Sequence, residues 1–509
     1  MFTGFILTDT YRLASKMGEP SSVIKDIISD YINRCSSYIN WILVDSADEM
    51  YSDLDKNDWK SYASILNDYY AGMGLEGAYH CPLFIIGSDD DIPMPRVDSP
   101  LVSIGREYLC SDMLYCYAAH GNYNEVNLVA DTPRFAVGRL PIADEYDAEW
   151  FRLYLEDCVR FVNTGLPVRG AAMTTTQSWL RASNEMMKDI PTVTLSEEYV
   201  PLNNRMIVSP DLDTYYQDMY DGYVHELKKI DMLVCNLHGS NELDEPYFLG
   251  EDVDHTRSTI ATQPSMLADA TPYIFNTVAC FGGRYINYQV TESMLLSAMA
   301  YGTMLYCGSC EIALGGDNME GNSELMMKLY NIYLFQGMPA GMALIKAKQD
   351  YYNTCHDEDG DENALFTILE FNLFGCPLLA MQPQLPNNYA PSLLGHQIAR
   401  TKSGSYQPKT IEVITGNAHS ADDIHAYLRG LVDNNLAIIR QKVEEAVYQR
   451  LGLGSENLQQ VARITRYHHE IGYRFLYRWT PQQSYRHFEM YYIVQTDNNG
   501  EITKIIHTK

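Results

Sequence analysis

Short apolar runs alternate with segments of helical spacing along the first 165 residues. An apolar run bounded by turn residues is typical of a buried strand, and apolar residues three and four positions apart indicate one face of a helix. Strands that alternate with helices predict a parallel sheet with right-handed crossovers. The expected strands are 5–7, 38–44 and 83–86, and the expected helices lie in 21–28, 59–70 and 144–162.

Two further apolar runs each end at a residue with reactive chemistry. Ile230 to Leu237 is followed by His238 and Gly239, and Pro272 to Ala279 is followed by Cys280. Both runs are typical of buried parallel strands, and an open parallel sheet binds ligands outside the carboxyl ends of its strands. The interval of 42 positions (280 − 238) allows one loop-and-helix crossover between adjacent strands. The pattern predicts that the imidazole and the thiol meet at one edge of the sheet.

A cysteine beside a histidine suits acyl transfer. The thiolate is the nucleophilic form of cysteine, and a neighbouring imidazole promotes it and moves protons. Gly239 has no side chain to obstruct its amide, and the amide of Cys280 lies beside the nucleophile, so these two N–H groups are the candidate oxyanion hole. The alternative is structural, because a cysteine after a strand is often a buried apolar residue and His-Gly is often a turn.

Five further motifs accompany this pair in order along residues 1–385. Together with His-Gly-Ser at 238–240 and Val-Ala-Cys-x-Gly-Gly at 278–283, they resemble the caspase-like (clan CD) cysteine peptidases, and the gingipain family, peptidase family C25, in particular. In the last motif Cys376 stands where that family has an acid. The five motifs are Pro82–Pro93, Ser111–Tyr115, Val137–Leu140, Gly302–Ser309 and Phe371–Leu379.

The resemblance implies an α/β, caspase-like fold of two tandem α/β subdomains with mainly parallel sheets. Residues 1–165 would form a non-catalytic subdomain and residues 166–385 the catalytic one. The implied activity is that of a cysteine endopeptidase that cleaves after Arg or Lys at P1. Asp317 would line the P1 pocket with Glu320 in reserve, and the alternative for Asp317 is a solvated turn.

The resemblance leaves the third catalytic residue open. In gingipain-like peptidases an acid in the region of 174–177 orients the histidine, and this chain has Thr-Thr-Thr-Gln there. Glu185 and Asp189 lie nearby in the sequence without a secure alignment. His120-Gly121 is a second His-Gly pair, and we expect it to be a decoy. A catalytically weak, caspase-like pseudoenzyme acting as a scaffold and a peptide ligase are the alternatives to the peptidase.

The chain changes character after residue 385. Residues 386–409 are rich in Pro, Ser and Asn and predict a linker. Residues 410–509 predict a small α+β module, with helices in 422–450, a strand over 472–479 and a β-hairpin over 490–507. We expect this module to dock on the peptidase or on a regulatory partner.

The composition limits the classes of molecule that we expect the chain to bind. A net charge of −29 over 509 residues argues against nucleic acid and anionic membranes and suits basic protein or peptide substrates. The 11 cysteines show no paired framework, which suggests reduced thiols. The N-terminal stretch resembles a first strand rather than a signal peptide, and no apolar run is long enough to span a membrane. We therefore expect a cytoplasmic protein, although gingipain-like enzymes are often secreted.

No cofactor is expected, with one exception. The run Asp89, Asp90 and Asp91 offers carboxylates that calcium prefers, so a structural calcium is possible there. The run lacks the spacing of an EF-hand loop, and the alternative is a solvated acidic loop.

Overall fold

The fold is described from a computed structural model of the chain. The structure describes residues 2–75, 80–101, 108–120, 132–168, 170–188, 190, 205–209, 230–240, 247–251, 258–269, 271–315, 323–355, 361–383, 458–460, 473–479, 490–496 and 502–508. Within these ranges no helix is both long enough and apolar enough to cross a membrane.

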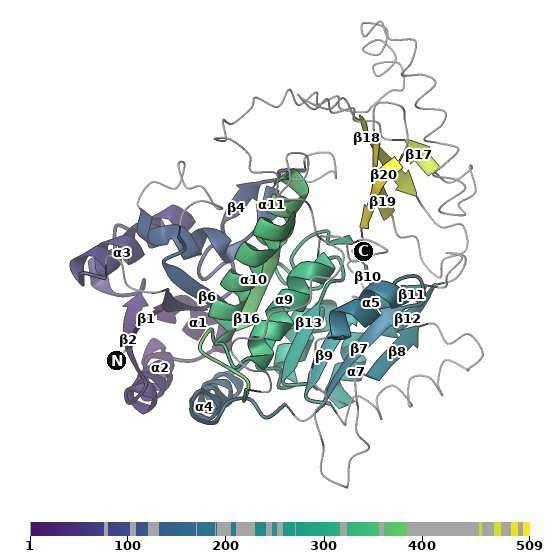
Figure 1. Ribbon diagram of the computed structural model, residues 1–509. Helices are drawn as coiled ribbons and strands as arrows, with labels where there is room; N and C mark the ends of the chain where they lie inside the picture. Colours follow the sequence, from purple (N-terminus) through teal and green to yellow (C-terminus); the bar gives the residue numbers. More distant parts are fainter. Residues whose placement is uncertain are drawn as a thin grey trace, which may run out of the picture.

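A ten-stranded sheet forms the centre of the molecule, in the order β2-β1-β3-β6-β16-β14-β13-β9-β7-β8 (Figure 1). The first four strands run parallel to one another and form what we call the first half; the last five also run parallel and form the second half. β16 joins them, antiparallel to β14 and paired with β6 at Phe374 and Arg139. The strands span Phe2–Thr8 (β1), Ile39–Asp45 (β2), Cys81–Ile86 (β3), Phe135–Leu140 (β6), Ala171–Thr176 (β7), Arg205–Ser209 (β8), Met232–Asn236 (β9), Ile274–Thr277 (β13), Leu305–Ser309 (β14) and Phe371–Gly375 (β16).

Helices cover both faces of this sheet. Right-handed crossovers from β1 to β2 and from β2 to β3 run in opposite directions, so they place α2 and α3 on opposite faces. α10, α9 and α5 contact one another in turn and lie in front of the sheet in Figure 1. The helices span Thr10–Met17 (α1), Ser21–Cys35 (α2), Trp59–Gly72 (α3), Ala148–Thr164 (α4), Leu180–Met187 (α5), Pro264–Asp269 (α7), Met294–Ala300 (α8), Ser323–Phe335 (α9), Ala340–Cys355 (α10) and Asp361–Glu370 (α11), with 3₁₀ turns at Glu49–Tyr51 (η1), Asp112–His120 (η3) and Val290–Glu292 (η4).

The predicted α/β class with a mainly parallel sheet is confirmed. The strands expected at 5–7, 38–44 and 83–86 correspond to β1, β2 and β3. The helix expected from residue 144 begins later, because the side chain of Asp147 caps it by accepting a hydrogen bond from the N–H of Trp150 at 2.7 Å.

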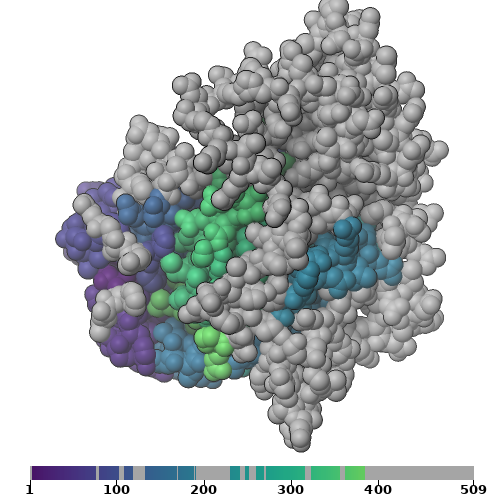
Figure 2. Space-filling model, in the orientation of Figure 1, coloured from purple at the N-terminus to yellow at the C-terminus, as the bar shows by residue number. Residues whose placement is uncertain are grey.

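The carboxyl ends of the two halves lie at the same edge of the sheet. Tyr285 follows β13, and Met94 follows β3. The hydroxyl of Tyr285 donates a hydrogen bond to Sδ of Met94 at 3.6 Å. The surfaces of the first half and of the helices around residue 350 also adjoin directly on the face shown in Figure 2. The predicted boundary between residues 165 and 166 stays a prediction, but one continuous sheet takes strands from both sides of it.

A buried polar cluster forms at the junction of the halves. Arg139 is fully buried and makes two hydrogen bonds of 2.7 Å to the carboxylate of Asp112. Burial acts to lower the pKa of Arg139, but the charge of Asp112 outweighs it and raises that pKa. Asn372 of β16 accepts a hydrogen bond from the N–H of Asp112 at 2.8 Å. Residues from three separate motifs of the sequence therefore meet in one structural cluster.

Three smaller sheets complete the described fold, and the largest has five strands in the order β15-β20-β19-β18-β17. The strand and hairpin predicted for the tail correspond to β18, β19 and β20, while residues 422–450 lie outside the described part of the chain. The predicted linker and module boundaries stay predictions. The strands of these sheets are Arg96–Asp98 (β4), Tyr108–Cys110 (β5), His238–Gly239 (β10), Phe248–Glu251 (β11), Ser258–Thr262 (β12), Leu314–Gly315 (β15), Leu458–Gln460 (β17), Tyr473–Trp479 (β18), Met490–Thr496 (β19) and Ile502–Thr508 (β20).

Candidate active site

The structure places His238 and Cys280 at the same level of two adjacent strands. β9 and β13 are parallel neighbours in which Cys235 pairs with Thr277. His238 lies three residues beyond Cys235, and Cys280 lies three residues beyond Thr277. Neighbouring strands are about 4.8 Å apart, so the matched register brings the two segments side by side at the carboxyl edge of the second half.

Gly239 makes this approach possible. A Cβ atom added to Gly239 would lie 1.7 Å from the carbonyl oxygen of Cys280 and 2.6 Å from its carbonyl carbon. No side chain fits in that space, so the backbones after β9 and β13 are in direct contact. This contact brings together Gly239 and Cys280, whose amides are the predicted oxyanion donors; that role stays a prediction.

The turn after Cys280 is tight and partly strained. Phe281 has a φ of +57°, a left-handed conformation that costs a non-glycine residue about 1–2 kcal/mol. Its N–H donates to the carbonyl of Glu311 at 2.6 Å, and the N–H of Gly283 donates to that of Ser309 at 2.7 Å. A Cβ on Gly282 would lie 2.6 Å from the methyl group of Thr277. The turn is therefore anchored to the segment after β14, which fixes where the thiol points.

Backbone atoms of one residue surround the thiol of Cys280. The N–H of Ala313 donates to Sγ at 3.3 Å, and Sγ lies 3.7 Å from the carbonyl oxygen of the same residue. Ala313 immediately precedes β15, so the thiol lies next to the first residue of that strand.

The candidate pair is covered rather than open. Cys280 is 3% exposed and His238 is 1% exposed. The cavities of about 330 Å³ beside Arg12 and Arg96 and of about 320 Å³ beside Lys348 are not lined by His238 or Cys280. The hollow that the sequence predicts at the pair stays a prediction.

The imidazole of His238 has an acidic neighbour that the sequence analysis missed. Nε2 of His238 lies 3.0 Å from Oε1 of Glu251, and both side chains are almost completely buried. The ring of Trp179 lies 4.3 Å from the imidazole ring, tilted by 57°. Glu251 reaches this position because β10 and β11 pair in antiparallel register, with His238 opposite Leu249. A carboxylate and an indole thus hold the imidazole from two sides.

Glu251 is fixed by the end of β7. The hydroxyl of Thr176 accepts the N–H of Glu251 at 2.7 Å and donates to its carbonyl at 2.5 Å. The N–H of Gln177 also donates to that carbonyl at 3.0 Å, and the hydroxyl of Ser178 donates to the carboxylate at 3.0 Å. This is the segment in which the resemblance predicts an orienting acid. Here it supplies the partners of an acid that comes from another strand.

The two acids considered from the sequence are elsewhere. Glu185 pairs with Lys188 at 3.4 Å on α5, and its side chain is 41% exposed. Asp189 lies outside the described residues. The available signal for Glu251 was weak: an apolar stretch, Tyr247 to Gly250, that ends in an acid. The crossover from β9 to β13 was expected to contain a loop and a helix, but it contains β10, β11 and β12 as well as α7, and that hairpin delivers the acid.

Other predicted site residues have different outcomes. Asp317 and Glu320 lie outside the described residues, as does Gly121. Cys376 is buried beside Tyr31, whose hydroxyl lies 3.4 Å from Sγ. Burial raises the pKa of Cys307 to about 12 and that of Cys110 to about 11, so these thiols stay protonated at neutral pH.

The acidic run considered for calcium is engaged with cations. Asp89 makes two hydrogen bonds to Arg96, of 2.7 and 2.8 Å. Nζ of Lys16 lies 2.6 Å from Asp90 and 2.9 Å from Asp91. Across the described residues, no group of three or more His, Cys, Asp or Glu side chains is arranged to hold a metal. Calcium binding at this run stays a prediction.

The chain was compared with known proteins. No family model matches it, and no curated protein matches it significantly. A solved structure described as "Structure of Protease" is similar over 99% of this chain and 96% of its own, with 10% identity and a TM-score of 0.47. The Saccharomyces cerevisiae separase–securin complex is similar over 59% of this chain and 15% of its own, with 11% identity and a TM-score of 0.30. At these TM-scores neither likeness establishes a family or an activity for this chain.

Proposed function

We propose that the chain is a caspase-like cysteine peptidase of the gingipain type, with Cys280 as nucleophile and His238 as acid and base. The observation that carries the proposal is the matched register: a thiol and an imidazole, each three residues beyond a paired position, follow adjacent parallel strands. A core cysteine needs no such partner. A nucleophile needs one, because proton transfer requires the base within hydrogen-bond reach.

The surrounding residues suit the proposed chemistry. With Nε2 of His238 directed at Glu251, Nδ1 is the nitrogen that would protonate the leaving amine and then take a proton from water. The Cys280 thiolate would attack the scissile carbonyl carbon to form a thioester, which water then hydrolyses. The amides of Gly239 and Cys280 would hold the oxyanion of each intermediate. Glu251 acts as a positioning residue, because a carboxylate at one nitrogen fixes which tautomer the ring adopts.

Substrate preference is part of the proposal and rests on charge and on the resemblance. A chain with net charge −29 attracts basic peptides, and Asp317 is the proposed P1 carboxylate for Arg or Lys. The physiological setting is proposed to be the cytoplasm. A regulatory protein that acts through residues 410–509 is a proposed partner.

A pair of cysteine variants tests the proposal. Cys280→Ala should lower the turnover of Arg- and Lys-containing peptides by at least about a thousandfold, because the nucleophile is lost. Cys307→Ala removes a buried thiol from the neighbouring strand β14 and should retain activity once folding is verified. Scanning P1 in a peptide library, with product masses read directly, also separates hydrolysis from ligation. Equal turnover in Cys280→Ala and the parent would refute the assignment.

A scaffold without turnover is the second candidate, and the burial of the pair favours it. Cys280 at 3% and His238 at 1% exposure leave no open path to a substrate in this conformation. An electrophilic Arg or Lys peptide separates the two candidates. Stoichiometric labelling of Cys280 would exclude the scaffold. A folded chain whose Cys280 is never labelled would favour the scaffold.

A further inference from the structure

The C-terminal strand joins a strand of the catalytic half. In the five-stranded sheet, β17, β18, β19 and β20 come from residues 458–508, but the edge strand β15 comes from the segment that follows β14. β15 and β20 are antiparallel, with Leu314 opposite Thr508 and Gly315 opposite His507.

β15 begins next to the thiol. The residue before it, Ala313, donates its N–H to Sγ of Cys280 at 3.3 Å, and consecutive Cα atoms are about 3.8 Å apart. Ala313 and Leu314 are fully buried. The carboxylate of Glu370 interacts with the backbone of Leu314 and with the hydroxyl of Ser323, 3.3 Å away. β15 is therefore anchored to the body, and its outer edge is the strand edge beside the nucleophile.

A strand edge binds extended polypeptide. Its N–H and C=O groups pair with the backbone of an added strand whatever the sequence, and side-chain pockets then select the residue. A peptidase substrate must present its scissile carbonyl to Cys280 as an extended chain, and β15 supplies the adjacent backbone groups.

We propose that the outer edge of β15 is the polypeptide-docking edge of the site and that β20 occupies it, so that the chain blocks its own site until β20 leaves. This rests on the proposed function, because it names how that site binds substrate and how access is controlled. Cys280 and His238 are 3% and 1% exposed in the structure in which β20 is paired with β15.

The pairing pattern makes release feasible. β20 shares two residue pairs with β15 but five with β19, and β19 shares seven with β18. The contact with the body is thus the smallest of the three. When it opens, β18, β19 and β20 retain their own ladder and move as a unit, and no other described strand needs to unpair. A tethered strand competes at a high effective concentration, so a contact of two pairs is enough to exclude a dilute peptide.

Proline substitutions in the full chain test the occupancy. Successive residues of a strand direct their N–H groups to opposite sides, so either His507→Pro or Thr508→Pro removes the donor that faces β15. The matched controls are His507→Ala and Thr508→Ala, which keep the N–H. All variants carry Cys280→Ala, so that binding is measured without turnover. Hydrogen exchange at Gly315 reports the pairing, because the N–H of Leu314 is directed at Glu370, and exchange in β13 reports whether the body is folded.

The probe is a fluorescein-labelled octapeptide with one central Lys, and its Kd is measured by anisotropy. We expect at least one proline variant to bind it about tenfold more tightly than its alanine control, since Kd falls as the open fraction rises. Exchange at Gly315 should rise in the same variant. If neither proline variant gains affinity while the body stays folded, or if the alanine controls already bind as tightly, the occupancy proposal is wrong.

Turnover in the same variants with Cys280 intact keeps the two proposals separate. A gain in peptide affinity without turnover in any variant would refute the peptidase and retain the docking edge. Turnover that depends on Cys280 but is equal in the proline and alanine variants, with no gain in affinity, would refute the docking edge and retain the peptidase.

Discussion

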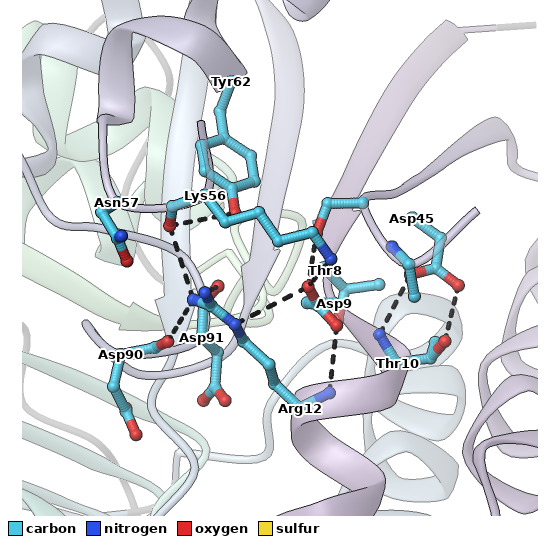
Figure 3. Close-up of polar contacts among 12 residues, drawn as sticks. Thr8, Asp9, Thr10, Arg12, Asp45, Lys56, Asn57, Tyr62, Asp90 and Asp91 are labelled. Carbon is cyan, nitrogen blue, oxygen red and sulfur yellow. Dashed lines mark hydrogen bonds and ion pairs between the residues drawn. The ribbon is translucent and has the colours of Figure 1, made fainter. Parts of the chain in front are cut away.

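The carboxyl edges of the two halves of the sheet use polar residues in opposite ways. At the edge of the first half, buried charges neutralise one another, as Figure 3 shows. Asp9 is fully buried and accepts hydrogen bonds from Lys56 at 2.8 Å, from Ser46 at 2.8 Å and from the N–H of Arg12 at 3.0 Å. Burial acts to raise the pKa of Asp9, but the hydrogen bond from Lys56 and the others outweigh it and lower that pKa.

The next strand of the first half repeats the arrangement. Asp45, at the end of β2, accepts the N–H of Thr10 at 3.0 Å and its hydroxyl at 2.6 Å. Lys25 lies 3.3 Å from the same carboxylate. The carboxylates of Asp9 and Asp45 thus accept hydrogen bonds from donors on several segments, and the result is a set of connections among β1, β2 and their helices.

The edge of the second half instead brings together the two residues that we propose as catalytic. His238 and Cys280 follow adjacent strands, and the acid Glu251 lies against the imidazole. The two edges therefore bring polar groups together for different uses. The first edge, which we call the structural edge, pairs carboxylates with cations and hydroxyls. The second, which we call the reactive edge on the basis of the proposed function, places a thiol, an imidazole and a carboxylate together.

The largest expected effect tests the structural edge. Arg139→Met leaves the buried carboxylate of Asp112 without its cation, which should lower the free energy of unfolding by about 3–5 kcal/mol. The control, Arg152→Met, removes exposed pairs with Glu149 and Glu156 and should leave the urea midpoint unchanged. Equal midpoints for the two variants would mean that the Arg139 cluster does not hold the halves together.

The second test compares one close-packed glycine from each edge. Gly239→Ala puts a methyl group on the carbonyl of Cys280 and should lower kcat by about a hundredfold or more, because misplaced reacting groups cost that much. Gly87→Ala, at a φ of +143° and 2.7 Å from Cβ of Asp91, should lower stability instead. Its kcat should stay near that of the parent in the folded fraction. Peptidase assays and urea unfolding on both variants decide the comparison. A loss of kcat in Gly87→Ala with full activity in Gly239→Ala would contradict it.

The third test concerns the acid of the reactive edge. Glu251→Gln should lower kcat by about 10–100-fold with little change in KM, the range seen when a partner that orients a ligand or base is removed. Glu251→Asp should restore part of the loss, and the alkaline limb of the pH–rate profile should move to lower pH in Glu251→Gln because the imidazolium that protonates the leaving amine loses its counter-charge. A loss of rate with an unchanged pH profile and no rescue by Asp would indicate a role in folding alone.

The sequence predicted the elements whose periodicity is strong and local. The apolar runs before His238 and Cys280 predicted β9 and β13, and the parallel register then follows from the sheet class. Glu251 could not be predicted in this way, because its position depends on the antiparallel pairing of β10 with β11 and on Thr176, 75 residues earlier in the chain.

The pairing of β20 with β15 was also beyond the sequence. The two strands are separated by nearly two hundred residues, and β15 is only two residues long, too short for any periodicity. The motifs around Asp112 and Arg139 were read through the resemblance as part of a peptidase, and their contacts are those of an ion pair that supports the fold. Long-range pairings of this kind are visible only once the sheet order is known.

The smallest expected effect is a pH dependence at the structural edge. Burial raises the pKa of Asp91 to about 6, against the opposing charge of Lys16. The folded chain therefore holds this proton more tightly than the unfolded chain, so the contribution of Asp91 to stability is present below pH 4 and is lost as the pH rises through 6. Asp91→Asn removes the titration, so its free energy of unfolding relative to the parent should increase between pH 4 and pH 7 by on the order of 2 kcal/mol.

The control is Asp90→Asn, at an exposed neighbour of the same lysine, and its free energy of unfolding relative to the parent should not change with pH in this way. Urea unfolding at pH 4, 5, 6 and 7 measures both, and parallel curves for Asp91→Asn and the parent would show that Asp91 stays ionised in the folded chain.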